Sequence, residues 1–307
     1  MRKAFIQSLI KIASADERVM LLTADLGYLV IEEFIENFPN RFLNVGAAEQ
    51  NMVGIATGLA DAGFIPYIYS ITPFATLRPL EFIRNGPVYH NLPVRIVGVG
   101  QGVEYGLNGL SHYALEDIGV LRTQPNLTII APADNAQTQS AVERTHTLPG
   151  PIYFRLSKDN IEIPELDGTF EIGQAQQIGN GADLLMISSG AITQEAIKAA
   201  RILAEAGFDA TILVISSISP VSEKNLIEAL SRFQYVFTLE SHYITGGIGS
   251  LIAEVAAENR LSVKLTRLGF NSILNETVGS EASIRALHNL SAEKVAGCIQ
   301  KILENHV

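Results

Sequence analysis

The chain has 307 residues, of which 47% are hydrophobic, and its formal net charge at pH 7 is -10. Its length and apolar fraction predict a globular protein with a large core and two domains. The negative charge argues against nucleic acid and an anionic membrane as main partners. The chain has no apolar run of about 18 residues, and Asp16 and Glu17 stand where a secretory signal would stay uncharged, so we expect a cytoplasmic protein.

The first half of the chain alternates between helical spacing and short apolar strands. Pro73 and Pro79 predict an irregular segment over residues 70–78, before a helix through Phe82. In chain order we predict a helix (4–15), a strand (19–23), a helix (31–38), a strand (42–45), a helix (52–60), strands (65–69 and 94–99), a helix (115–122), a strand (127–130), a helix (136–145) and a strand (152–156).

The pattern loosens over residues 159–181, where proline and glycine recur, and we place a domain boundary there. Beyond it we predict a strand (184–188), a helix (193–206), a strand (211–215), a helix (223–230), a strand (235–240), a helix (248–258) and a strand (263–268). Such alternation predicts an α/β protein with two tandem domains, each a mostly parallel sheet with helices on both faces. The predicted division is a domain over 1–160, a linker over 161–180 and a domain over 181–307.

Glu49 lies at the turn between the strand over 42–45 and the helix that follows. Side chains at such turns project past the carboxyl end of a sheet, where ligands bind in open α/β folds. A glutamate there is either a catalytic acid or a residue that only stabilises the positive end of the helix. The local pattern by itself favours the second interpretation.

Three other residues, Asp25, His112 and Cys298, are also interpreted from their local sequence. Asp25 follows a predicted strand, where turn aspartates are common without any function. His112 ends the glycine-dense stretch 98–112, which would either wrap a ligand or form a flexible loop, and a lone histidine is more often structural than catalytic. Cys298, the single cysteine, has apolar neighbours and is expected to be a buried small hydrophobe.

The order and spacing of four stretches resemble the pyrimidine-binding and carboxy-terminal domains of transketolase. The stretches are AEQNMVGIATGLA, GLNGLSHYALEDIGVLRTQPNLTIIAPAD, GPIYFRLSKDN and LESHYITGGIGS. Four matched blocks along one chain are far more specific than any one of them. The resemblance implies that residues 1–160 bind the pyrimidine of thiamine diphosphate and that residues 181–307 form the carboxy-terminal domain.

The chain lacks the GDG motif with which transketolases hold Mg²⁺ and the cofactor's diphosphate. The resemblance therefore implies the carboxy-terminal subunit of a split transketolase. It also implies a separate amino-terminal subunit that carries GDG and the Mg²⁺ ligands, in an α2β2 heterotetramer. Gly54 and Gly58 would serve close helix packing across the dyad. Gly246 opens a helix that looks like an anion site, but the family gives that domain an assembly role.

Within the resemblance, Glu49 falls on the family's catalytic glutamate. A carboxyl held against the aminopyrimidine ring nitrogen would favour the imino tautomer, which removes the thiazolium proton. His112 matches a histidine that contacts the substrate and would act in catalysis as charge develops on the donor oxygen. Asp25 matches an aspartate near the cofactor.

An aromatic side chain stacks on the aminopyrimidine in this family, and Phe74 is the best match. Tyr69 and Phe82 are the fallback residues, and core packing is the alternative for all three. Arg78 and Glu81 match the same segment, with a structural role as the first interpretation.

The match departs from the family pattern at the sugar end of the site. Arg2 matches an arginine that grips the sugar phosphate, but Lys158 replaces a second arginine and offers a point charge in place of a fork. Gly100 and Leu29 stand where the family has a histidine and a serine. Asn108 replaces an aspartate that contacts donor hydroxyls. These departures predict a ketose transfer with an altered sugar preference.

Two rival functions stay open. One is the beta subunit of a 2-oxo acid dehydrogenase decarboxylase component, which shares both domains and the subunit split. The other is a non-catalytic regulatory subunit that kept the fold. The presence of both Glu49 and His112 argues against the second rival, and the altered phosphate site argues for it.

Overall fold

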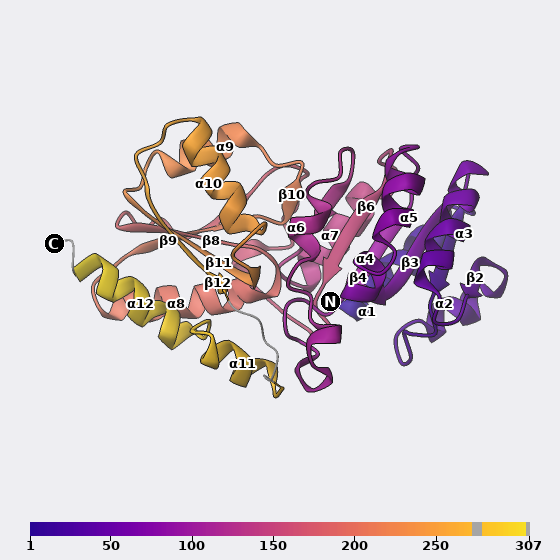
Figure 1. The fold of residues 1–307 in the computed structure, drawn as a ribbon, viewed down its shortest axis with the longest axis horizontal. Coiled ribbons are helices and arrows are strands. Elements are labelled where there is room, and N and C mark those ends of the chain that lie inside the picture. The colour runs from indigo at the N-terminus through magenta and orange to yellow at the C-terminus, as the bar shows by residue number, and fades with distance from the viewer. Residues whose placement is uncertain (272–277, 305–307) are drawn as a thin grey trace.

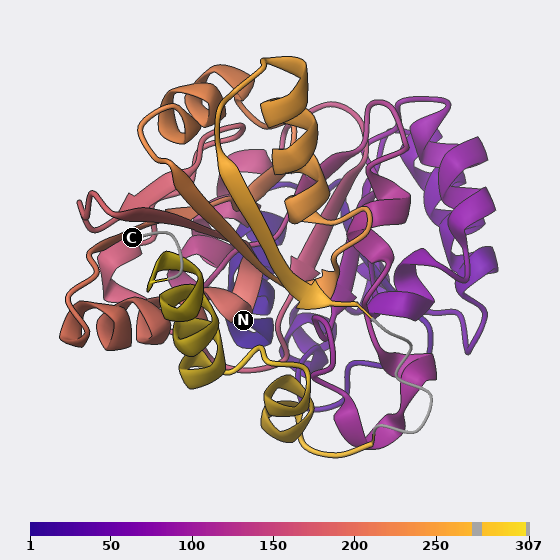
Figure 2. The same ribbon diagram turned by 60° about the vertical axis from the view of Figure 1, so that its left-hand side comes forward.

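The protein, described by a computed structural model over residues 1–271 and 278–304, consists of two lobes that lie side by side. Each lobe is built on one twisted sheet (Figure 1). Residue 1 lies where the lobes meet, and the carboxy-terminal helix runs along the outer side of the second lobe (Figures 1 and 2). Within the described residues, no helix is both long and apolar enough to cross a bilayer.

The first sheet has seven strands in the order β10-β5-β6-β4-β3-β1-β2. Adjacent strands in this sheet are parallel, except β10 and β5, which are antiparallel. The strands are β1 (Val19–Thr23), β2 (Phe42–Asn44), β3 (Ile65–Ile71), β4 (Arg95–Val99), β5 (Thr128–Ile130), β6 (Ile152–Leu156) and β10 (Ser217–Ser219).

Helices cover both faces of this sheet. One apolar layer holds side chains of α1, α2 and α7, and the other holds side chains of α3, α4, α5 and α6. These helices are α1 (Arg2–Ala15), α2 (Glu32–Asn37), α3 (Glu49–Asp61), α4 (Thr72–Thr76), α5 (Leu80–Ile83), α6 (Asp117–Leu121) and α7 (Asn135–Thr145).

The second sheet has five strands in the order β12-β11-β8-β9-β7, of which only the pairing of β7 with β9 is antiparallel. Helices α8, α11 and α12 lie on one side of it, and α9 and α10 lie on the other (Figures 1 and 2). The elements are β7 (Gln176–Ile178), β8 (Leu184–Ser188), β9 (Ala210–Val214), β11 (Tyr235–Tyr243), β12 (Lys264–Phe270), α8 (Thr193–Glu205), α9 (Glu223–Leu230), α10 (Ile248–Glu258), α11 (Glu281–Leu287) and α12 (Ala292–Glu304).

The predicted α/β class with two tandem, mostly parallel sheets is confirmed. The expectation of an irregular segment over residues 70–78 was wrong, because β3 continues to Ile71 and α4 starts directly after it. Pro73 lies in the first turn of α4, where a missing amide proton costs nothing. The exact division into 1–160, 161–180 and 181–307 stays a prediction, and β10 shows that the second half also adds a strand to the first sheet.

Two local expectations in the second lobe have a clear outcome. The start of α10 binds an internal carboxyl group, since the Glu240 side chain accepts hydrogen bonds from Ile248 N (2.8 Å) and Gly249 N (3.1 Å). This contact supports the structural interpretation of the glycines before α10. Cys298 is only half-buried, because the core side of α12 is formed by Val295 and Ile299.

Candidate active site

The predicted site residues gather at the carboxyl ends of the parallel strands in the first sheet. Asp25 follows β1, Glu49 follows β2, Phe74 follows β3, His112 lies in the loop after β4, and Lys158 follows β6. This edge of an open α/β sheet is the usual place for a ligand. The sheet therefore brings together residues that lie far apart in the sequence.

Glu49 is the first residue of α3, and its carboxylate is buried, with the residue 2% exposed. Gly46 has φ 73°, a left-handed conformation that turns the chain from β2 toward this helix. Arg78 Nη1 lies 2.6 Å from Glu49 Oε2. The Arg78 side chain is 42% exposed, so a buried carboxylate is reached here by a cation from the solvent side.

Phe74 lies between Arg78 and His112. The guanidinium carbon of Arg78 stands 4.2 Å from the centre of the Phe74 ring. The His112 ring packs edge-on against the same Phe74 ring, with 5.0 Å between the centroids. Burial, with the Arg78 charge adding to it, lowers the pKa of His112, so the imidazole is neutral at neutral pH. Ser111 Oγ lies 3.0 Å from His112 Nδ1, which leaves Nε2 for a ligand.

A second group of predicted residues continues from His112 toward the amino terminus. The Tyr105 ring lies 6.2 Å from the His112 ring, and Lys158 Nζ lies 5.5 Å from the Tyr105 centroid. Arg2 Nε donates to the backbone oxygen of Lys158 at 2.9 Å. Asn108 is exposed in the same loop as Tyr105. The Tyr105 ring thus lies between Lys158 and the histidine, and Arg2 is hydrogen-bonded to the Lys158 backbone.

Asp25 adopts φ 57° at the end of β1, a conformation that aspartate tolerates in turns. Its Oδ1 accepts hydrogen bonds from Asn44 Nδ2 (3.2 Å) and Tyr28 Oη (3.3 Å). Asn44 Oδ1 in turn accepts from the backbone amides of Asp25 and Gly46, both at 3.0 Å. Asp25 therefore belongs to a polar turn that supports the chain just before Glu49.

The two fallback aromatic residues lie elsewhere. Tyr69 is buried and stacks on Phe5 at 6.1 Å in the layer of α1, as core packing would have it. Phe82 is 44% exposed and lines a separate cavity of about 380 Å³ with Gly54 and Glu81. Of the three candidate rings, Phe74 is the one that shares a neighbour with Glu49.

Arg78 and Tyr105 were given little or no weight in the sequence, yet they connect the predicted residues to one another. Arg78 lies four residues beyond Phe74, in the turn just after α4, where the sequence has no periodic pattern to indicate its contacts. Tyr105 stands in a glycine-dense stretch that has no periodicity to indicate a contact. Their roles depend on loop conformation.

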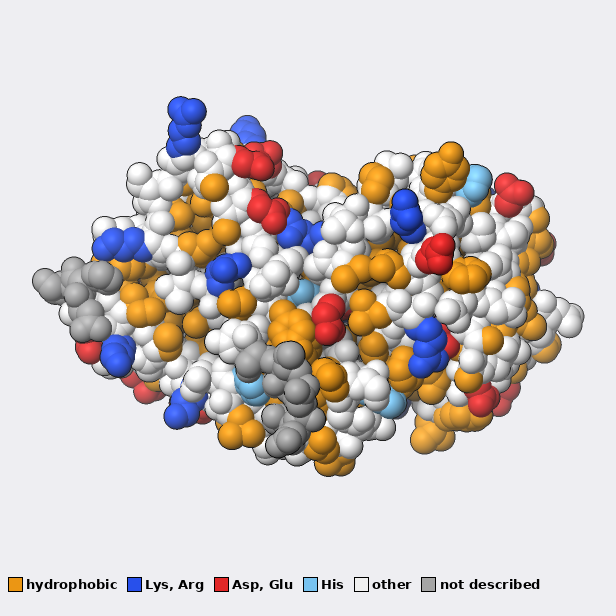
Figure 3. All heavy atoms as spheres, in the orientation of Figure 1, with side chains coloured by type: hydrophobic (Ala, Val, Ile, Leu, Met, Phe, Trp, Pro, Cys, Tyr) orange, Lys and Arg blue, Asp and Glu red, His pale blue; other side chains and the backbone are white. Residues whose placement is uncertain are grey.

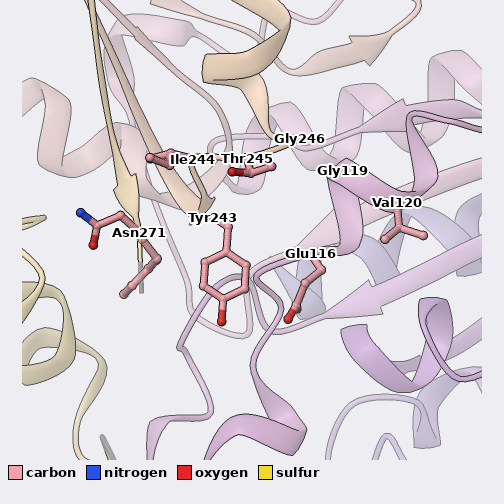
Figure 4. Close-up of a pocket in the computed structure, with 9 residues that line it drawn as sticks. Glu116, Gly119, Val120, Tyr243, Ile244, Thr245, Gly246 and Asn271 are labelled. Carbon is pink, nitrogen blue, oxygen red and sulfur yellow. The ribbon is translucent and has the colours of Figure 1, made fainter. Parts of the chain in front are cut away.

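A cavity of about 530 Å³ lies apart from these residues, between α6 and the end of β11. Figure 4 shows Glu116 and Tyr243 pointing into the same part of it from the two lobes. None of the described residues that line it is a predicted site residue. On the face drawn in Figure 3, acidic and basic side chains are interspersed among apolar ones, without a patch of one charge.

No three His, Cys, Asp or Glu side chains in the described part of the chain are grouped so that they could hold a metal ion.

Comparison with known families gives two matches that together cover nearly all of the chain. Residues 1–164 match the model of "Transketolase, pyrimidine binding domain", and residues 173–295 match that of "Transketolase, C-terminal domain".

Individual relatives agree with these matches. A Methanocaldococcus jannaschii protein, provisionally described as a transketolase C-terminal section, is 37% identical over 96% of this chain and 94% of its own length. A 6-deoxy-6-sulfo-D-fructose transketolase subunit of a Clostridium species is 31% identical over 99% of this chain and 94% of its own length. A solved structure described as "Split gene transketolase, inactive beta4 tetramer" superposes with a TM-score of 0.89 at 32% identity, over 99% of this chain and 98% of that one.

Proposed function

The chain belongs to the transketolase family, and we propose that it is the carboxy-terminal subunit of a thiamine diphosphate-dependent transketolase. Its reaction would move a two-carbon ketol unit from a ketose to an aldose. The observation that carries the proposal is the buried carboxylate of Glu49, which shares the guanidinium of Arg78 with the ring of Phe74.

The residues around Arg78 fit an aminopyrimidine. The Arg78 guanidinium is flat and nitrogen-bearing, donates a hydrogen bond to Glu49 and lies against the Phe74 ring. An aminopyrimidine held by this chain would occupy the same place, with a ring nitrogen that accepts a hydrogen bond from the Glu49 carboxyl and a ring face that lies on Phe74. We expect Arg78, which is partly exposed, to withdraw toward solvent when the ring binds.

Thiamine diphosphate, when bound, supplies the carbon nucleophile that opens the ketose carbon-carbon bond. The Glu49 carboxyl lies against the ring nitrogen and exchanges a proton with it during the reaction, in a pocket that excludes most water. His112 is neutral and presents a ring nitrogen to the donor's oxygen, where it gives or receives a hydrogen bond as charge develops. Phe74 orients the ring.

A separate subunit completes the site in this proposal. The cofactor's diphosphate and Mg²⁺ would be held by an amino-terminal subunit with a GDG motif, in an α2β2 heterotetramer. Two relatives that match 86% or more of this chain are themselves described as transketolase subunits. Gly54 and Gly58 support a contact along α3, because both are exposed and no atom lies within 4 Å of a Cβ placed on either.

The sugar preference is proposed to differ from that of phosphate-specific transketolases. The described relatives act on different sugars, 6-deoxy-6-sulfo-D-fructose in one and apulose-4-phosphate in another. In this chain Lys158 and Arg2 form the cationic end of the site and Asn108 its hydroxyl-binding part.

Replacement of Glu49 tests the proposed role of its carboxyl. Glu49→Gln and Glu49→Ala should lower ketol transfer about a hundredfold to ten-thousandfold, the usual contribution of a positioned acid or base. Stability should change by about 1 kcal/mol or less, because Arg78 is left partly exposed to water. The assay is sugar turnover by the reconstituted complex, with Glu36→Gln on α2 as the matched surface control. Wild-type turnover in either Glu49 variant would sink the assignment.

The same complex separates the rival functions. Pyruvate decarboxylation with a lipoyl acceptor, without ketol transfer, would identify a 2-oxo acid dehydrogenase component. Binding of thiamine diphosphate without cleavage of any ketose donor would identify a non-catalytic subunit.

A further inference from the structure

A cavity of about 400 Å³ lies between the lobes, next to the loop that follows β4. Its walls are residues 104–108 of that loop, Lys158 with Asp159 after β6, and residues 279–282 of the second lobe. The two lobes touch directly here. Gly279 N donates to Gly106 O at 3.4 Å, and a Cβ placed on Gly106 would lie 2.1 Å from Gly279 O.

Tyr105 forms the boundary between this cavity and the candidate active site. Its ring lies between His112 at 6.2 Å and Lys158 Nζ at 5.5 Å. A Cβ placed on Gly100 would lie 2.2 Å from Tyr105 Cε2. The ring therefore fills the space into which any side chain at position 100 would extend, so Tyr105 shapes the far end of the site.

The charges that line the cavity do not suit a dianion. Lys158 is the cation among the described lining residues, which also include the acidic residues Glu104, Asp159 and Glu281. Arg285 is engaged with Glu281 at 2.5 Å. Burial, followed by the charge of Glu281, raises the pKa of Glu104 to about 7. Arg2, the other cation of the proposed site, is not among the described residues that line this cavity. A phosphate here would meet the Lys158 ammonium and up to three carboxylates, so repulsion would offset its attraction to Lys158.

The same lining suits an uncharged chain of hydroxyl-bearing carbons. Carboxylates accept hydrogen bonds from hydroxyls, and the Asn108 amide and the Lys158 ammonium donate to them. The Tyr105 ring offers an apolar face to the carbon atoms between the hydroxyls. The volume of the cavity is that of a small-molecule subsite.

We propose that this cavity binds the unphosphorylated, polyhydroxylated far end of the sugar, with Tyr105 as its specificity-determining residue and the second lobe as one wall. The proposal rests on the function proposed above and adds the chemistry of the sugar's distal end. In this proposal the carboxy-terminal domain contacts the substrate, in addition to its role in subunit assembly.

The test compares D-xylulose with D-xylulose 5-phosphate as donors for the reconstituted complex. Wild type should prefer D-xylulose in kcat/KM. Tyr105→Ala should raise the KM for D-xylulose about tenfold and leave kcat within about twofold. The reason is that contacts with the far end of the sugar are equally strong in the bound substrate and in the transition state. Tyr105→Phe should keep the wild-type KM, since the ring face makes the contact. Asp159→Lys should raise kcat/KM for the phosphate donor about tenfold, and Glu205→Lys on α8 should leave the preference unchanged.

Direct binding keeps the two proposals distinct. Saturation-transfer NMR of D-xylulose with the full chain should show contact in wild type and a loss of signal in Tyr105→Ala. A complex that transfers ketol units but prefers the phosphate donor at least tenfold, with that preference unmoved by Asp159→Lys, would overturn the subsite and leave the enzyme assignment intact. Absence of any ketol transfer, with normal NMR contacts, would overturn the proposed function and keep the sugar site. Absence of NMR contact in wild type would also overturn the subsite.

Discussion

Replacing Arg155 by methionine should destabilise the protein strongly, because it leaves a carboxylate buried without its cation. Arg155 is 1% exposed and Asp117 0%, and Nε lies 2.7 Å from Oδ2. Arg155 Nη2 also donates to the backbone oxygens of Ala114 (2.9 Å) and Ser241 (3.0 Å). The guanidinium therefore joins the segment just after His112 to the second lobe.

The magnitude follows from what the variant leaves behind. Removing one partner of a buried ion pair costs about 3–5 kcal/mol. Tyr153 Oη still donates to Asp117 Oδ2 at 2.7 Å, so we expect the lower end, about 3 kcal/mol, or about 6–12 °C in Tm. Burial raises the pKa of Asp117, but the Arg155 charge and its hydrogen bonds outweigh burial and hold that pKa below its usual value.

Urea unfolding followed by circular dichroism measures this cost, with Asp117→Asn added to form a double-mutant cycle. The double variant should recover about 2 kcal/mol relative to Arg155→Met, since it buries no unpaired charge. Arg201→Met is the matched control, because its pair with Glu165 is exposed and should contribute about 0.5 kcal/mol or less. A loss below about 1 kcal/mol in Arg155→Met, or strict additivity of the two substitutions, would refute the reasoning.

Two further predictions concern the cofactor ring and pH. Phe74→Ala should weaken thiamine diphosphate binding to the reconstituted complex about three- to tenfold in calorimetry, whereas Phe82→Ala should not; equal losses would remove Phe74 from the site. Burial raises the pKa of Glu240 from 4.5 to about 7, so the folded protein binds this proton more tightly than the unfolded chain. Its stabilising contribution is therefore present below pH 4.5 and is lost as the pH rises through 7, by up to about 3 kcal/mol. Urea unfolding should show that slope in wild type and a flatter one in Glu240→Gln; identical slopes would contradict the assignment.

The fold was predictable where burial imposes a period on the sequence. Strands such as β4 and β6 are buried on both faces and read as apolar runs, and α3 repeats its apolar side chains at helical spacing. The short strands β7 and β10 were not predicted, since each has three residues and exists only through its antiparallel neighbour. Both segments are strands because they pair with a neighbouring strand, and not because their own residues favour a strand.

The site was predictable in its positions and not in its contacts. Glu49 and His112 fall next to strand ends, and parallel strands place those ends at one edge of the sheet. The contacts of Arg78 with Glu49 and of Tyr105 with Lys158 depend on the conformation of α4 and of a loop without periodicity. Neither kind of contact follows from residue spacing alone.

The central claim is that this chain builds only the pyrimidine half of a thiamine diphosphate site, around Glu49. Calorimetry of thiamine diphosphate with Mg²⁺ tests it most directly, first with the chain alone and then with an amino-terminal subunit that carries GDG. We expect tight binding only in the reconstituted complex, and Glu49→Ala should weaken it. Tight binding by the isolated chain, or no binding by the complex, would contradict it.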